Sequence, residues 1–129
     1  MVLRKLLNHP NIIQLHKIVR SKGQAIYLVF EFAKHDLQKL ISQPQIIFNK
    51  MQLKYILQQM LLGLQCMHSH GLMHRDIKGG NILINEEGIV KIADFGLARD
   101  MAPSTYYTSK VVTRWFRPPE IALGARTYT

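Results

Sequence analysis

The chain has 129 residues, of which 47% are hydrophobic, and its formal net charge is +9. This length suits one modest domain, and no apolar run approaches the ~20 residues of a membrane-spanning helix. The basic start is not followed by an apolar stretch and a small-residue cleavage site, so no signal peptide is expected. The lone Cys66 cannot form an internal disulfide, which fits a reducing compartment. Because Lys and Arg form no basic stripe and no aromatic-interleaved motif, we do not expect nucleic-acid binding.

Local patterns predict the elements of the first part of the chain. Residues 1–7 are typical of the end of a helix. Two strands are predicted over 15–20 and 25–31, because a glycine-containing turn separates two runs of strand-forming residues. A short helix is predicted over 36–41, with the side chain of Asp36 as its N-cap.

A long helix is predicted from Asn49, as its N-cap, to about Ser69, and Gly71 would end it. Its apolar residues recur at helical spacing and define one face. The members of this face are Leu53, Ile56, Leu57, Met60, Leu61 and Leu64. Gly63 lowers helix propensity by up to ~1 kcal/mol relative to Ala, which indicates that another segment packs closely there.

Two polar motifs follow the long helix. The sequence HRDIKGGN occupies residues 74–81, and DFG occupies residues 94–96. Two short strand-like runs lie between them around a glycine turn, so a hairpin over 82–93 can bring both motifs to one place. Phosphoryl transfer needs one carboxylate that orients the substrate hydroxyl, and a second carboxylate and an amide oxygen that hold Mg²⁺. The motif residues that supply these groups, and that we expect to converge, are Asp76, Asp94 and Asn81.

The two motifs, in this order, resemble the catalytic loop and the magnesium loop of protein kinases. The resemblance covers nearly the whole chain and is closest to the cyclin-dependent kinases. Residues 107–120, which end in Arg-Pro-Pro-Glu, are similar to the end of the activation segment in transcription-associated members. The resemblance implies an α+β, protein kinase-like fold. It would hold the last two strands of the N-lobe, the hinge between the lobes, into which residues 27–32 run, and the first half of the helical C-lobe.

Residues 1–129 contain no counterpart of the Gly-rich loop, the lysine of the third N-lobe strand, the glutamate of the regulatory helix or the C-terminal helices. The resemblance therefore predicts a partial kinase domain. One hypothesis is a serine/threonine protein kinase of the cyclin-dependent type that transfers the γ-phosphate of ATP to Ser or Thr, in Ser/Thr-Pro sequences of proteins. Residues 1–129 alone are then expected to be inactive. A second is a truncated, inactive fragment that has no function or serves as an interaction module. A third, a basic RNA-binding module, lacks the basic stripe that it needs.

The resemblance also assigns site residues. The catalytic residues would be Asp76, Lys78, Asn81 and Thr113. The cofactors would be ATP and Mg²⁺, with Asn81 and Asp94 as metal ligands. The residues that would contact ATP are Phe30, Glu31, Ala33, Asp36, Leu83 and Asp94. Core packing is an alternative role for Phe30 and Leu83, and helix capping alone is an alternative for Asp36.

Regulatory residues and partners are implied in the same way. Thr108 matches the activating phosphothreonine of the family, and Arg75 and Arg99 match two of the arginines that receive its phosphate. Lys78 is typical of serine/threonine kinases, and Lys110 stands where a MAP kinase would carry tyrosine. A cyclin-type regulatory subunit, protein substrates and a location in the nucleus, the cytoplasm or both are therefore expected.

A zinc site is the alternative for the cluster of one cysteine and three histidines around the end of the long helix. Cys66 and His68 lie at helix positions i and i+2, which do not face each other. His74 belongs to the catalytic motif, where the family packs it against Phe95. We therefore expect no zinc site.

Overall fold

A computed structural model describes residues 8–101, 107 and 113–128, so the helix end predicted over residues 1–7 lies outside the described part. The described elements, in chain order, are β1 (Leu15–Arg20), β2 (Ile26–Phe30), β3 (His35–Asp36), α1 (Leu37–Ile41), α2 (Lys50–Ser69), β4 (Leu72–Met73), the 3-10 helix η2 (Gly79–Asn81), β5 (Ile82–Ile84), β6 (Val90–Ile92), the 3-10 helix η3 (Phe95–Leu97), β7 (Arg99–Asp100), the 3-10 helix η4 (Arg114–Phe116) and α3 (Pro119–Ala122).

The strands form three small antiparallel sheets. β1 pairs with β2, and β4 pairs with β7. The third sheet has the order β3-β5-β6, and β5 and β6 are joined by a turn in which Ile89 N donates to the side chain of Asn85 at 2.7 Å. Both predicted hairpins, over 15–31 and 82–93, are therefore confirmed. The second one brings the segment after β6 back to the start of β5.

Side-chain caps fix the N-terminal ends of both predicted helices. Asp36 accepts a hydrogen bond from Lys39 N at 2.8 Å, as expected of an N-cap. Asn49 and Gln52 form a reciprocal capping box at the start of α2. Gly71, with φ 67°, follows the end of α2, which confirms its predicted role as a helix stop.

The apolar face predicted for α2 is only half right. Ile56, Met60 and Leu64 pack against the core, whose buried members are Ile12, Met67, Leu72, Ile82, Val90 and Ile92. The other predicted members are more than half exposed: Leu53 (51%), Leu57 (55%) and Leu61 (56%). The deepest stripe instead contains Gln59, Gly63 and Met67, because the segment that packs on α2 contacts it at the glycine.

Gly63 allows the close approach that the sequence indicated. A Cβ atom there would lie 2.8 Å from the backbone oxygen of Asn11 and 2.9 Å from Ile92 Cδ1. Beside this contact, Asn11 Nδ2 donates to Gln59 Oε1 at 3.0 Å and to Val90 O at 2.9 Å. Gln59 Oε1 also accepts from Val90 N at 3.0 Å. These contacts join α2, β6 and the segment that leads into β1.

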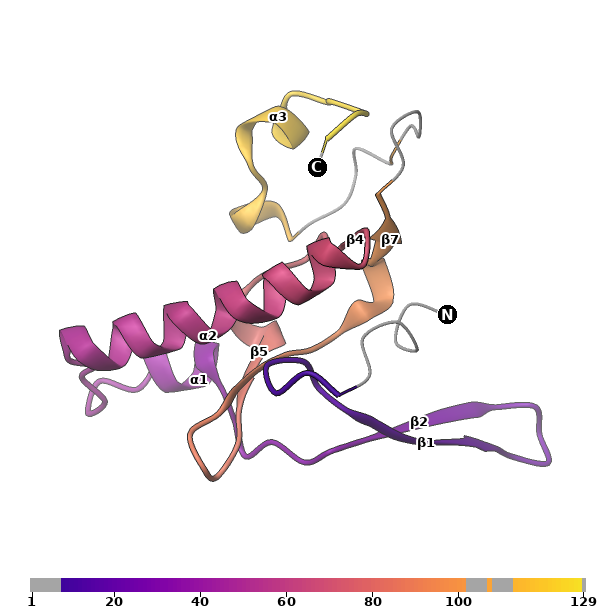
Figure 1. The fold of residues 1–129 in the computed structure, drawn as a ribbon, viewed down its shortest axis with the longest axis horizontal. Helices are drawn as coiled ribbons and strands as arrows, with labels where there is room; N and C mark the ends of the chain where they lie inside the picture. The colour runs from indigo at the N-terminus through magenta and orange to yellow at the C-terminus, as the bar shows by residue number, and fades with distance from the viewer. Residues whose placement is uncertain (1–7, 102–106, 108–112, 129) are drawn as a thin grey trace.

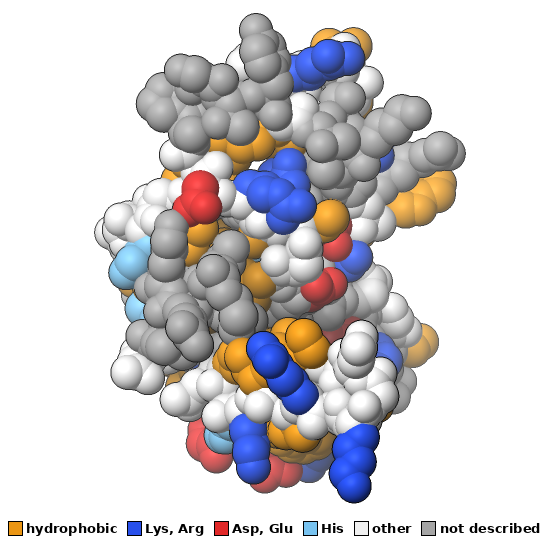
Figure 2. Space-filling view, turned by 90° about the vertical axis from the view of Figure 1, so that its right-hand side faces the viewer, with side chains coloured by type: hydrophobic (Ala, Val, Ile, Leu, Met, Phe, Trp, Pro, Cys, Tyr) orange, Lys and Arg blue, Asp and Glu red, His pale blue; other side chains and the backbone are white. Residues whose placement is uncertain are grey.

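The arrangement of the elements is seen in Figure 1. The β1–β2 hairpin lies at one side of the molecule and α3 at the other, with α2 and the β5–β6 hairpin between them. Every residue of β2 is exposed, including Ile26 (60%) and Tyr27 (59%). Hydrophobic side chains also reach the surface near the bottom of Figure 2, among Lys and Arg side chains. In the described part of the chain, no helix is long and apolar enough to cross a membrane.

Candidate active site

The first motif follows β4, whose two residues are buried between α2 and the segment after β6. The chain then turns through Arg75, which has a positive φ of 69°. Such a backbone conformation costs on the order of 1–3 kcal/mol in a residue with a side chain and persists only where its surroundings hold it. Here Arg75 Nε donates to Leu97 O at 2.7 Å, which ties the turn to η3. Asp76 is thereby placed at the start of a fixed loop that ends in η2.

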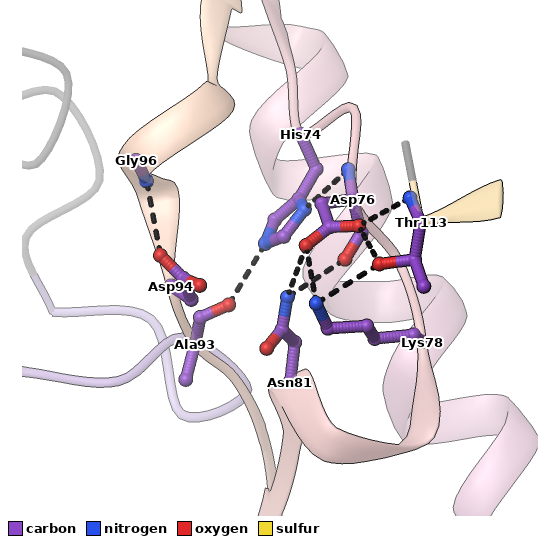
Figure 3. Close-up of polar contacts among 8 residues, drawn as sticks. All are labelled: His74, Asp76, Lys78, Asn81, Ala93, Asp94, Gly96 and Thr113. Carbon is purple, nitrogen blue, oxygen red and sulfur yellow. Dashed lines mark hydrogen bonds and ion pairs between the residues drawn. The ribbon is translucent and has the colours of Figure 1, made fainter. Parts of the chain in front are cut away.

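Four of the predicted site residues share one hydrogen-bond cluster, drawn in Figure 3. Asp76 Oδ2 accepts from Lys78 Nζ at 2.7 Å and from Asn81 Nδ2 at 3.1 Å. Asp76 Oδ1 accepts from Thr113 Oγ1 at 2.8 Å and from Thr113 N at 3.0 Å. Lys78 Nζ also donates to Thr113 Oγ1 at 3.0 Å. The cluster of Asp76, Lys78, Asn81 and Thr113 joins the catalytic-loop motif to a segment that lies far from it in the sequence.

The cluster holds Asp76 in its charged form. Burial, which leaves only 6% of the residue exposed, would by itself raise the pKa of the carboxyl. Hydrogen bonds from Lys78 and Thr113 and the charge of Lys78 outweigh burial and lower this pKa to about 2. Asp76 is therefore a fixed acceptor at neutral pH. It can orient a hydroxyl by accepting its hydrogen bond, but it takes up a proton only as the hydroxyl becomes strongly acidic.

His74 connects this loop to the second motif. Its Nε2 lies 2.9 Å from Ala93 O, and its Nδ1 accepts from Asp76 N at 3.2 Å. These partners assign the proton to Nε2 and leave Nδ1 as an acceptor. Burial lowers the pKa of His74, which agrees with a neutral ring. The ring also contacts Phe95, with centroids 5.3 Å apart, as the sequence predicted.

Asp94 adjoins the cluster but is not hydrogen-bonded to it. Its Oδ1 accepts from Gly96 N at 3.2 Å, and its backbone is left-handed with φ 61°, a region that Asp enters more readily than most residues. Ala93 N donates to Asn81 O at 2.9 Å, so the two motifs are joined immediately before Asp94. Figure 3 shows Asp94 linked, among the residues drawn, only to Gly96.

The oxygen donors near this junction suit a hard cation. Asn81 Nδ2 donates to Asp76 O and Asp76 Oδ2, which fixes the amide orientation and leaves Oδ1 as the acceptor. The carboxylate of Asp94 supplies the second oxygen group. Carboxylate and amide oxygens are the ligands that Mg²⁺ takes from proteins, with waters and phosphate oxygens completing its octahedron. The residues present therefore fit the ion that the sequence implied.

A cavity of about 580 Å³ lies beside Asp94. It is lined by residues from the strands before the hinge, from the β5–β6 hairpin and from the second motif. The predicted ATP-contacting residues among them are Phe30, Glu31, Leu83 and Asp94, and Arg99 also lines the cavity. The lining does not include Ala33 or Asp36. Asp36 is occupied as the N-cap of α1 and pairs with Lys39 at 3.1 Å.

Comparison with known proteins decides the family. The model of the protein kinase domain matches residues 1–129. The chain belongs to the protein kinase domain family. It is 49% identical, over 99% of its length, to the protein named cyclin-dependent kinase C-2 C of Arabidopsis thaliana, of which it covers 20%. The predicted resemblance to cyclin-dependent kinases and the α+β, kinase-like fold are thereby confirmed.

Two solved kinase structures extend the comparison. The chain matches the yeast RNA Pol II CTD kinase complex CTDK-1 with a TM-score of 0.90 and 39% identity, over 98% of the chain and 42% of the matched chain. It matches the CAK complex of Chaetomium thermophilum bound to ATP-γ-S with a TM-score of 0.91 and 42% identity, over 98% and 40%. The kinase chain described here spans between 18% and 37% of the length of curated relatives that it matches. Protein kinases as a family use ATP and Mg²⁺.

The regulatory residues of this kinase chain are only partly described. The predicted phosphorylation site, Thr108, lies outside the described residues. Arg75 and Arg99 donate to the backbone oxygens of Leu97 and Ala98, respectively, each at 2.7 Å. Their guanidinium groups therefore bind carbonyls of consecutive residues after the second motif.

Sequence reasoning missed a buried ion pair at this kinase hinge. Lys91 Nζ lies 2.9 Å from Glu31 Oε1, and their side chains are only 11% and 18% exposed. The available signal was a lysine between two buried β-branched residues of a short strand, since Lys is almost never buried without a partner. The sequence could not name the partner, because Glu31 lies on a distant segment.

The zinc alternative finds no support in the described residues. They contain no group of three or more His, Cys, Asp or Glu side chains placed to hold a metal ion. His74 is committed to Ala93, and the ring of His70 contacts Cys66 O at 2.8 Å through Nδ1. Burial raises the pKa of the Cys66 thiol, which disfavours the thiolate that zinc requires.

Proposed function

We propose that this chain carries the catalytic loop, the magnesium loop and the hinge of a serine/threonine protein kinase of the cyclin-dependent type. The observation that carries the proposal is the cluster around Asp76, in which Lys78, Asn81 and Thr113 all hydrogen-bond to one carboxylate. A carboxylate in a purely structural role does not need this many fixed hydrogen-bond donors. It is the arrangement expected of a group that must hold one direction while a substrate hydroxyl binds.

In the proposed reaction, the substrate hydroxyl oxygen bonds to the γ-phosphorus of ATP while the bond from that phosphorus to the ADP oxygen breaks. Asp76 accepts the hydrogen bond of the hydroxyl and takes its proton late in the step, because the pKa of its carboxyl is about 2. Lys78 lies beside this carboxylate and would contact the transferred phosphoryl group. Its positive charge there would oppose the negative charge of the phosphate oxygens.

ATP and Mg²⁺ are proposed as the cofactors of this site. Asn81 Oδ1 and the Asp94 carboxylate would hold the metal, which supplies charge neutralisation at the phosphates. The cavity lined by Phe30, Glu31 and Leu83 supports a place for the adenine ring, because its walls are mainly apolar and it opens beside Asp94. Ala33 would contact the nucleotide from outside this lining, through the hinge backbone. A ribose contact by Asp36 would require its carboxylate to serve the cap of α1 and Lys39 at the same time.

The proposed substrates are proteins, phosphorylated on Ser or Thr that precedes proline. The support for Ser or Thr is Lys78 and its contact with Thr113, a pairing that resembles the serine/threonine kinases. The preference for a following proline rests on the resemblance to the cyclin-dependent kinases. A cyclin-type subunit is the proposed partner, since a close relative is named as cyclin-dependent and both matched structures are complexes. A phosphate on Thr108 would be bound by the guanidinium groups of Arg75 and Arg99.

The proposed location is inside the cell, in the nucleus, the cytoplasm or both.

The test is phosphate incorporation into matched peptides by the natural gene product that contains residues 1–129, expressed with its copurifying subunit. The peptides carry Ser-Pro, Ser-Ala or Tyr-Pro at one position, and the Asp94→Asn variant is the blank. We expect incorporation into the Ser-Pro peptide above all others. Equal labelling of the Tyr-Pro peptide would contradict the substrate class. Incorporation no greater than the blank would instead favour the inactive fragment.

A further inference from the structure

The side chain of Lys91 lies in the interior at the junction of three segments. Lys91 Nζ is 2.9 Å from Glu31 Oε1 and donates to Pro10 O at 3.1 Å. Glu31 Oε1 also accepts from Gln14 N at 2.7 Å, and Glu31 N donates to Gln14 O at 2.9 Å. The hinge residue Glu31 is therefore held both through its backbone and through its carboxylate.

On the Lys91 side of the Lys91–Glu31 pair, the chain leads directly to Asp94, the predicted metal ligand. Lys91 is the middle residue of β6, and the chain runs from β6 into Asp94. β6 is itself fixed, because Ile92 N donates to Asn11 O at 2.9 Å and Ile13 N donates to Ile92 O at 3.0 Å. Lys91 thus joins the segment that bears Asp94 to the segment that bears Glu31. Both Asp94 and Glu31 line the same cavity.

A purely structural role for the pair is the alternative. A buried lysine needs a partner, and removing one member of a buried pair destabilises a protein whatever its function. Two features go beyond that requirement. The carboxylate of Glu31 shares one oxygen between Lys91 and Gln14 N, so the side chain has a single direction. In addition, the pair links the adenine end of the proposed nucleotide site to its metal end, rather than two elements of the core.

We propose that Lys91 is a positioning residue that holds the hinge at Glu31 in fixed relation to Asp94 and thereby sets the affinity for the nucleotide. The nucleotide part of this inference rests on the proposed function. The part that concerns the hinge does not, since it predicts the order of the Glu31 backbone with no ligand bound. In this role Lys91 itself contacts neither substrate nor metal, but only Glu31 and the backbone oxygen of Pro10.

The experiment compares three variants of the natural gene product with the unchanged protein. Lys91→Met keeps the length of the side chain and removes its charge, and Lys91→Arg retains the charge. Lys34→Met is the matched control, because Lys34 forms an exposed pair with Glu86 at 3.6 Å close to the hinge. The measurements are the KM for ATP, the KM for peptide, the melting temperature and the exchange rate of the Glu31 amide hydrogen.

For Lys91→Met we expect the KM for ATP to rise by about tenfold, the size of an ordinary coupling between two sites, and the peptide KM to stay unchanged. The Glu31 amide should exchange about tenfold faster than in the unchanged protein, because its hydrogen bond to Gln14 O opens more often. Lys91→Arg should keep both the KM for ATP and the Glu31 exchange rate close to those of the unchanged protein. Lys34→Met should change neither quantity. If Lys91→Met does not fold, Glu31→Gln replaces it, with smaller changes in the same direction.

Two results would overturn the inference. One is a lower melting temperature with an unchanged KM for ATP and an unchanged Glu31 exchange rate. The other is an equal rise in the two KM values, which would indicate general loss of structure. If the unchanged protein transfers no phosphate, the proposed function fails and the amide exchange decides the inference. Faster exchange confined to Glu31 and Gln14 then supports it, and unchanged exchange rejects it.

Discussion

Replacing Thr113 with valine removes one donor from the Asp76 cluster without changing the size of the side chain. Thr113 Oγ1 donates to Asp76 Oδ1 at 2.8 Å, whereas the bonds from Thr113 N and Lys78 Nζ to the carboxylate can remain. One hydrogen bond to a charged group is worth ~1.5–3 kcal/mol, and a pKa shift of one unit corresponds to about 1.4 kcal/mol. The pKa of Asp76 should therefore rise from about 2 by at least about one unit in Thr113→Val.

The same change alters stability in a defined pH window. The pKa of Asp76 is lower in the folded chain than its ordinary value of 3.8, so its contribution is present above that value and is lost as pH falls through about 2. That contribution is about 2–3 kcal/mol in the unchanged chain and at most about 1 kcal/mol in Thr113→Val. The loss should therefore be seen at neutral pH and should shrink as the solution is made acidic.

The assay is a carbon-13 NMR titration of the aspartate carboxyl groups, with chemical unfolding at neutral and acid pH as the second measurement. Thr113→Ser keeps the hydroxyl and should keep the pKa, and the exposed Thr127→Val is the control for loss of a threonine hydroxyl elsewhere. An Asp76 pKa that is the same in Thr113→Val and in the unchanged chain would refute the reasoning. The hydroxyl would then contribute nothing to the charged state of the carboxylate.

Three further predictions concern the fold. In thermal melts, Gly63→Ala should lower the free energy of unfolding by about 1–2 kcal/mol, because its Cβ would lie 2.8 Å from Asn11 O; this cost outweighs a helix-propensity gain of up to ~1 kcal/mol. Gly23→Ala is the control and should be tolerated, since its Cβ would meet nothing within 4 Å. Equal melting of the two variants would contradict this prediction. Because Leu57 and Leu61 are exposed, the 129-residue chain should self-associate in sedimentation velocity. Replacing both leucines with lysine should reduce the self-association, whereas Met67→Lys, at a buried position, should unfold the chain. A monodisperse unchanged chain would count against the prediction. Burial lowers the pKa of His74 below its ordinary 6.5, so its contribution to stability is full above pH 6.5 and falls as the pH drops below that value. His74→Phe should therefore flatten the stability profile below pH 6.5, and an unchanged slope there would contradict this role of His74.

Much of this fold could be predicted because its determinants are local. The Asn49–Gln52 capping box sets the start of α2, and the spacing of the two motifs around a glycine turn sets the β5–β6 hairpin. The contacts of Lys78 and Asn81 with Asp76 were predictable from the catalytic-loop motif, since both residues lie on the same tight loop. In each case the interacting residues are close in sequence or belong to a motif with a fixed geometry.

What could not be predicted depends on contacts between distant segments. The helical period of α2 identified an apolar face, but it did not identify which side of the helix is buried. That side is set by Asn11, which packs at Gly63, so Leu53, Leu57 and Leu61 are left exposed. The Lys91–Glu31 pair has the same origin, because strand pairing near Ile92 brings two remote segments together. A single sequence carries no pairing information of this kind.

The Asp76 cluster is proposed as a phosphoryl-transfer site. The most direct test is to measure the steady-state kinetics of the Asp76→Asn variant in the natural gene product that contains residues 1–129. Asn keeps the size of the side chain and one oxygen for Lys78 and Thr113, but it removes the charge that orients the hydroxyl. We expect kcat to fall by at least about 100-fold while the KM for ATP stays unchanged, because Asp76 acts on the transferring group and not on the nucleotide. An unchanged kcat in a folded Asp76→Asn variant would contradict the proposal.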